Sequence, residues 1–172
     1  YTAVCAMPNL NPAPDTVEHV KEQIALIEKN AKVHVYPYGC ITMGQKGRGE
    51  LCDYESMKPY VAGFSDDGKG VQETDTMREA MKRVKAAGGI IVAHCEDESL
   101  LNGGYIHAGD YAAIHGHKGI CTQSEYLPFV RDMELVARTG CRYHFCHMSA
   151  AGSVKALRNA KSLGLKVSGE TC

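Results

Sequence analysis

The sequence has 172 residues, which is enough for one well-buried domain and does not require two. Its 19 basic and 20 acidic residues give a net charge of −1 without a basic stripe, so the charge pattern does not indicate binding to nucleic acid or to a membrane surface. No run approaches the roughly 20 apolar residues of a membrane span, and the first residues lack the basic start of a secretion signal. These features predict a soluble cytoplasmic protein with a small-molecule ligand.

The eight cysteines have neither the spacing of a disulfide framework nor that of a zinc finger. They form no Cys-x-x-Cys pair, and several lie inside apolar runs. Because buried thiols in a reducing compartment explain this pattern, we expect free cysteines.

The first half of the chain alternates apolar runs with amphipathic helices. An apolar run at 2–7 predicts a strand, and a capping box at 15–18 opens a helix whose apolar face is Val17, Val20, Ile24 and Ile27. The run 33–41, rich in Val, Tyr and Ile, predicts a second strand. A weak helix at 50–59 precedes a third strand at 60–64.

The same alternation continues through the middle of the chain. Helical spacing at Met77, Ala80, Met81 and Val84 predicts a helix that Gly88-Gly89 ends before a fourth strand at 90–93. The glycine-rich stretch 101–121, which carries His107, His115 and His117, predicts a long surface loop of a length that is often functional.

The last part of the chain adds two more strands. A capping box at 122–125 opens a helix that Gly140 ends, and a strand follows at 142–148. Val154, Leu157 and Leu163 mark another helix, and a sixth strand begins at 166–168.

This βα alternation predicts a parallel sheet with right-handed crossovers, either doubly wound or a (β/α)8 barrel. Polar residues follow nearly every strand, and no Gly-x-Gly-x-x-Gly phosphate loop follows the first, so the barrel is favoured. Six strands cannot close an eight-stranded barrel. We therefore expect the chain to be a piece of a longer protein.

Carboxylate and imidazole groups follow three of the predicted strands. Asp66 and Asp67 end the third strand, although an Asp-Asp-Gly turn explains that pair when it is taken alone. His94 ends the fourth strand, where a lone histidine is more often packed or capped than bound to metal. The carboxyl ends of parallel strands meet at one edge of a sheet, and Asp and His side chains suit zinc. A metal site is therefore an alternative to the turn and to the packed histidine.

The strand at 142–148 contains two histidines, of which only one should point into a barrel. Period 2 places His147 on one face, while His144 and Cys146 share the other. His147 lies nearer the carboxyl end and is the better ligand candidate, so we expect His144 and Cys146 to face the helices. Lys69 lies beyond the glycine, out of line with its strand, and is not selected as a bridging ligand.

The segment 7–12 follows the first strand and is typical either of a Pro/Asn turn or of a loop that binds substrate. In the second case Asn9, which can both donate and accept hydrogen bonds, would orient a polar substrate.

Taken together and in this order, several segments resemble the class I dihydroorotases of the cyclic amidohydrolase superfamily. The segments are Ala6-Met7-Pro8-Asn9 with Pro12, Phe64-Ser65-Asp66-Asp67-Gly68, Val92-Ala93-His94-Cys95-Glu96-Asp97, Ser124-Glu125 with Arg131-Asp132, Tyr143-His144-Phe145-Cys146-His147-Met148-Ser149, and Gly169-Glu170-Thr171.

The resemblance implies an α/β fold of the (β/α)8 TIM type, in which residues 1–172 supply strands two to seven of one barrel domain. The first and last strands and a small β-sandwich would be absent. Asp67 would bridge two zinc ions, His94 and His147 would bind the second ion, and Asn9 would help to hold the substrate. The family's His-x-His-x-Arg and its last-strand aspartate have no counterpart here, so the resemblance leaves no catalytic residue in this chain and implies that the piece alone is inactive.

The activity implied is zinc-dependent, reversible hydrolysis of the cyclic amide of dihydroorotate to N-carbamoyl-aspartate, in pyrimidine biosynthesis. An allantoinase or hydantoinase is one alternative, although hydantoinases resembling this chain carry a carboxylated lysine at the position of Asp67. A non-catalytic scaffold for aspartate carbamoyltransferase is another. The implied partners are the small-molecule substrate, a second copy in a homodimer and the carbamoyltransferase.

Overall fold

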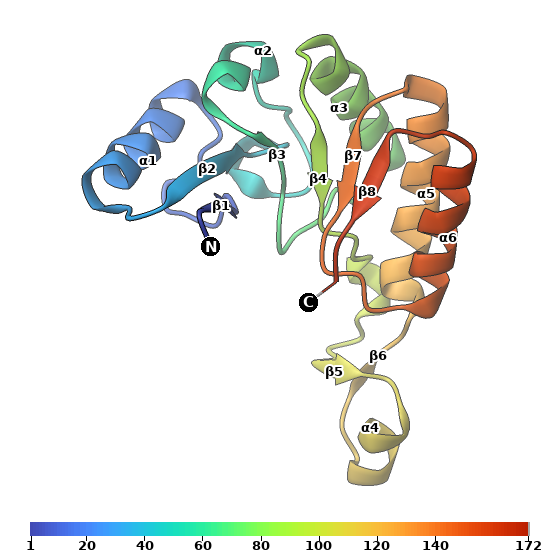
Figure 1. Ribbon diagram of the computed structural model, residues 1–172. Helices are drawn as coiled ribbons and strands as arrows, with labels where there is room; N and C mark the ends of the chain where they lie inside the picture. Colours follow the sequence, from blue (N-terminus) through green and yellow to red (C-terminus); the bar gives the residue numbers. More distant parts are fainter. Residues whose placement is uncertain (172) are drawn as a thin grey trace.

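A computed structural model describes residues 1–171 and contains one curved sheet of six parallel strands (Figure 1). In spatial order the strands are β1 (Ala3–Ala6), β2 (His34–Gly39), β3 (Gly63–Phe64), β4 (Ile91–Ala93), β7 (Tyr143–Phe145) and β8 (Val167–Gly169). The helices are α1 (Val17–Asn30), α2 (Tyr54–Met57), α3 (Thr74–Ala86), α4 (Asp110–His115), α5 (Gln123–Thr139) and α6 (Ala151–Ser162), with short 3-10 turns η1 (Met43–Gln45), η2 (Lys58–Tyr60) and η3 (Glu98–Leu100). The predicted α/β class and partial barrel are confirmed.

The helices cover the convex side of the sheet, and the hydrophobic core lies between the two layers (Figure 1). Phe64, Tyr143 and Phe145 are fully buried there, and the rings of Phe129 on α5 and Phe145 stack with centroids 4.3 Å apart. Burial of such large apolar side chains is the main favourable term in folding.

The concave side of the sheet carries the alternate side chains of the same strands. His144 and Cys146 line an open cavity on this side together with Val92, whereas Tyr143 and Phe145 belong to the core under the helices. The prediction that His144 and Cys146 face the helices is therefore wrong. The two aromatic rings fill the space under the helices, and period 2 then turns His144 and Cys146 to the concave side.

The sequence predicts a long surface loop at residues 101–121. In the structure this segment instead forms a small excursion with its own secondary structure. β5 (Ile106–His107) pairs in parallel with β6 (Gly119–Ile120), and α4 connects them. The excursion projects away from the sheet (Figure 1). Its tip holds a group of rings, in which Tyr111 lies 4.3 Å from His115 and 5.8 Å from His117 between centroids.

Several helix ends differ from their prediction because partners come from elsewhere in the chain. The N-cap of α1 is Thr16, whose hydroxyl accepts from the His19 backbone N–H, while Asp15 accepts from the Gly44 backbone N–H at 2.7 Å. The predicted capping box at 122–125 does not form. Gly140 does end α5, in the left-handed conformation. None of the described helices is long and apolar enough to cross a membrane.

Candidate metal centre

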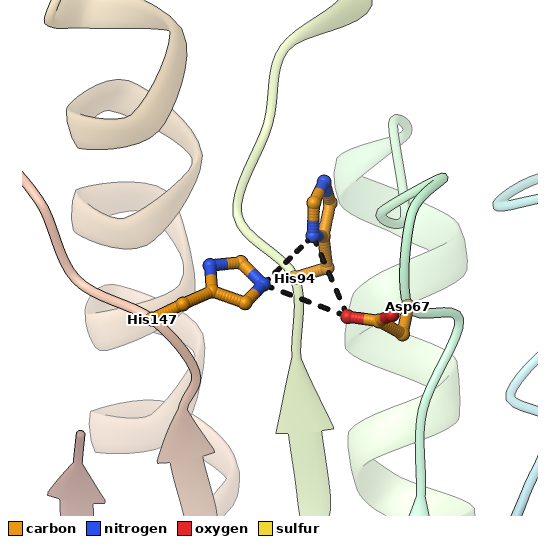
Figure 2. A group of neighbouring side chains, drawn as sticks. All are labelled: Asp67, His94 and His147. Atoms are coloured by element: carbon orange, nitrogen blue, oxygen red, sulfur yellow. Dashed lines mark hydrogen bonds and ion pairs between the residues drawn. The ribbon is translucent and has the colours of Figure 1, made fainter. Parts of the chain in front are cut away.

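Asp67, His94 and His147 come from the loops that follow β3, β4 and β7, which are neighbours in the sheet. Figure 2 shows the three side chains pointing toward one another just beyond the strand ends. The Oδ1 atom of Asp67 lies 3.6 Å from Nδ1 of His94 and 3.5 Å from Nε2 of His147, and these two nitrogens are 2.9 Å apart. The structure thus brings together the three residues that the sequence singled out as ligands.

His147 reaches this group because the backbone turns after β7. The residue has φ of +42°, a conformation that is rare for residues other than glycine. The strand pairing continues to Cys146, whose backbone N–H donates to the Ala93 carbonyl at 3.1 Å, and period 2 no longer applies beyond it. The carboxylate of Glu125 accepts from the backbone N–H groups of Ser149 and Ala150 at 2.9 and 3.0 Å. The loop that carries His147 is therefore tied to the first turn of α5.

The loop after β4 is tied to the same turn of α5. The Asp97 backbone N–H donates to the Ser124 carbonyl at 2.7 Å. Behind this loop, the Tyr143 hydroxyl donates to Asp132 at 2.8 Å and lies 3.1 Å from the Cys95 thiol. Both histidine loops consequently rest on α5. Single-sequence reasoning missed Glu125 in this role, because the only local signal was a capping box that does not form.

The adjacent carboxylates Asp66 and Asp67 have different surroundings. Asp66 is 1% exposed and accepts from the backbone N–H groups of Ile41, Thr42 and Gly47, and from the Thr42 hydroxyl. Burial raises the pKa of Asp66, and these hydrogen bonds oppose the shift. Asp66 thus holds the loop after β2, while Asp67 alone faces the histidines.

Asn9 and Gln45 surround the outer side of Asp67. The Asn9 amide donates to Oδ2 of Asp67 at 2.8 Å, and the Gln45 amide donates to the Asp67 carbonyl at 2.7 Å and also to the Asn9 oxygen. Asn9 therefore lies beside Asp67, and both of its polar atoms bond within the group. The sequence did not indicate Gln45, because it lies in a glycine-rich loop. Its φ is +55°. Lys69 is exposed.

The charges of the group favour an ionised carboxylate. The nearby imidazoles of His147 and His94, together with the hydrogen bond from Asn9, hold the pKa of Asp67 well below its usual range. The same carboxylate raises the pKa of His147. A carboxylate that stays ionised is what metal binding requires, because protons compete with the metal for the ligand.

The spacing of Asp67 from the two histidines also fits a metal ion, whereas the 2.9 Å between the two histidine nitrogens is shorter than the separation of two ligands on one ion. Ligand atoms at about 2.0–2.2 Å around a tetrahedral zinc ion lie about 3.2–3.6 Å apart, close to the separations of Asp67 from the two histidines. Nε2 of His94 is buried without a hydrogen bond to any described residue, and it lies 3.5 Å from a carboxylate oxygen of Glu96. One carboxylate and two imidazoles suit zinc, and a fourth position stays open for water or substrate.

A cavity of about 230 Å³ opens directly beside this group. His94 and His147 form one wall, and His107 from β5, Glu125 and Ser149 form others. Its volume suits a small polar molecule better than a polymer.

The fold and the site together define a class: a partial (β/α)8 barrel with a candidate metal centre at the carboxyl edge. A family model described as dihydro-orotase-like matches residues 1–153, and the chain belongs to this family.

Two curated relatives show the same relationship in sequence. The dihydroorotase of Bacillus caldolyticus is 46% identical over 171 residues, and that of Geobacillus thermodenitrificans is 47% identical over 171 residues. Each match covers 99% of this chain and 40% of the relative, so the chain spans about two fifths of the length of these relatives.

Solved structures agree in fold. The L-hydantoinase of Arthrobacter aurescens superposes with a TM-score of 0.79 at 19% identity, over 99% of this chain and 39% of that protein. A D-hydantoinase superposes with a TM-score of 0.74 at 13% identity, over the same shares. At these identities the likeness shows the fold alone.

Proposed function

We propose that this chain is the central part of a zinc-dependent dihydroorotase, which interconverts dihydroorotate and N-carbamoyl-aspartate in pyrimidine biosynthesis. The observation that carries the proposal is the convergence of Asp67, His94 and His147 at one strand edge. The 46% identity to a dihydroorotase supports the same activity. An aspartate at position 67, in place of the lysine expected in a hydantoinase, favours dihydroorotase within the superfamily.

Each residue of the site has a role in this proposal. Asp67, His94 and His147 hold zinc, which when bound polarises the amide carbonyl and activates water near neutral pH. Asn9 orients the polar substrate, and Gln45 fixes Asn9 through its hydrogen bond. Recognition of the substrate carboxylate and proton transfer to the leaving nitrogen fall to parts of the relatives that this chain does not span. The proposed setting is the cytoplasm, with a homodimer and aspartate carbamoyltransferase as protein partners.

The test uses the longest natural protein that contains residues 1–172. Zinc content is measured by elemental analysis, and turnover is followed with dihydroorotate, carbamoyl-aspartate, hydantoin and allantoin. Asp67→Asn, His94→Ala and His147→Ala should each lower both zinc content and turnover, because each removes one ligand. His34→Gln, on the exposed side chain of β2, is the matched histidine control and should retain both.

Other outcomes would decide against the proposal. A protein with little zinc and no turnover would be a scaffold, and preferred turnover of hydantoin or allantoin would be a sister enzyme. Residues 1–172 by themselves should bind zinc weakly and show no turnover. Turnover within tenfold of the longer protein would place the catalytic groups in this chain and contradict the roles given above.

A further inference from the structure

A second group of metal-binding side chains lies on the concave side of the sheet, on β7 and next to β8. The parallel register pairs His144 with Ser168. One step further, the Glu170 backbone N–H donates to the Phe145 carbonyl at 2.9 Å, which places Glu170 beside Cys146. By period 2, these four side chains leave the two strands on the same side.

The geometry of this group resembles that of the Asp67 group. Nδ1 of His144 is hydrogen-bonded to the Ser168 hydroxyl at 2.8 Å, which orients the ring and leaves Nε2 free. Nε2 lies 3.5 Å from a carboxylate oxygen of Glu170. This is beyond the distance of a strong hydrogen bond but typical of two ligands on one ion. One ligand atom from each of His144, Cys146 and Glu170 lies within 4.8 Å of the other two.

We propose that His144, Cys146 and Glu170 form a second metal site, which takes a thiolate-preferring divalent cation such as Zn²⁺ or Cd²⁺. The sulfur ligand distinguishes it from the Asp67 site, which offers only oxygen and nitrogen, and it disfavours Mg²⁺ and Mn²⁺. Ser168 supplies the outer hydrogen bond that metal-binding histidines usually make. The inference shares no residue with the proposed dihydroorotase centre and does not rest on it.

The residues of this group differ in exposure. The Cys146 side chain is 1% exposed, whereas that of Glu170 is 55% exposed and faces the open concave cavity of about 510 Å³. The thiol of Cys5 lines the same cavity but is not one of the three clustered ligands. Cys5 is therefore a matched control for a thiol near the site but outside it.

The test is a Co²⁺ titration of the longest natural protein that contains this chain. A sulfur ligand gives Co²⁺ a charge-transfer band in the near ultraviolet, and the Asp67 site has no sulfur to produce one. We expect the band in the parent protein, in Cys5→Ser and in Asp67→Asn, and its loss in Cys146→Ser. Equilibrium dialysis should show one fewer bound Co²⁺ in Cys146→Ser than in Cys5→Ser.

Glu170→Gln keeps the thiol and the side-chain shape, so it tests the site even if Cys146→Ser does not fold. It should weaken the affinity measured from the charge-transfer band by about tenfold or more, as loss of a metal-supporting group does. A parent protein without the band at saturating Co²⁺ would overturn the proposal. So would a band that survives Cys146→Ser, or one that Glu170→Gln leaves at unchanged affinity.

Discussion

The helix-covered face of the sheet and its carboxyl edge are built from the same strands but are held together differently. On the face, the side chains of Phe64, Tyr143 and Phe145 are fully buried and have mainly apolar neighbours. At the edge, the side chains of Asp67 and His94 are 18% and 17% exposed, and directional hydrogen bonds fix them. Apolar packing thus stabilises the helix-covered face, whereas hydrogen bonds position the side chains of the candidate metal centre at the edge. Mutations on the face should therefore change stability, and mutations at the edge should change metal binding.

The largest effect is expected from truncation on the helix-covered face. Phe145→Ala removes a ring stacked on Phe129 and should lower the free energy of unfolding by about 3–5 kcal/mol. His144→Gln, one residue away on the concave side, should cost less than about 1 kcal/mol. Urea denaturation of both variants measures the difference. Equal losses would show that the concave side contributes as much packing as the helix-covered face.

The adjacent carboxylates at the end of β3 sharpen the comparison within the edge itself. Asp66→Asn places an amide against four hydrogen-bond donors and should cost about 2–3 kcal/mol in unfolding free energy. Asp67→Asn should cost about 1 kcal/mol but remove metal binding at this centre. Denaturation without metal and calorimetric zinc titration measure the two properties. The separation fails if Asp67→Asn destabilises the protein as much as Asp66→Asn does.

Glu125 links the two regions, since it lies on a core helix and holds the loop of His147. Glu125→Ala removes both acceptors from the Ser149 and Ala150 N–H groups, so the position of His147 should loosen. We expect the zinc affinity to fall about 10- to 100-fold, as for other groups that orient a ligand.

The matched control for Glu125 is Thr16→Ala, which removes the N-cap of α1. It should cost about 1 kcal/mol in stability and leave zinc affinity unchanged. Isothermal titration of both variants gives the answer. If the two lower the affinity alike, general destabilisation and not the position of His147 is responsible.

The smallest effect concerns the periphery of the edge, where His19 pairs with Asp15 at 2.7 Å. The hydrogen bond that the His19 ring donates to this carboxylate raises the pKa of His19 above 6.5. A raised pKa means that protonation stabilises the folded state. The contribution is therefore complete below pH 6.5 and is lost as the pH rises through the folded-state pKa. Because the pair is partly exposed, it amounts to about 0.5 kcal/mol or less.

Thermal unfolding between about pH 6 and pH 8 checks this contribution. The decrease in stability with rising pH should be smaller in His19→Gln than in the parent protein. An identical pH dependence in both would show that the pair contributes nothing, and that all pH dependence comes from the edge and the core.

The sequence by itself determined the alternation of strands and helices, although the strand predicted at 142–148 ends at Phe145. Apolar runs and helical spacing are local signals, which is why the six main strands and the end of α5 at Gly140 were predictable. Parallel strands align their carboxyl ends, so the meeting of Asp67, His94 and His147 also followed from the order of the strands.

Only the tertiary structure decided which face each side chain takes and which distant groups support the site. The space under the helices accepts Tyr143 and Phe145, and this places His144 and Cys146 on the concave side. Contacts between distant segments likewise bring the carboxylate of Glu125 to the loop after β7 and give His147 its positive φ. Packing volume and long-range hydrogen bonds have no period along a sequence, and they become readable only when the strands are side by side.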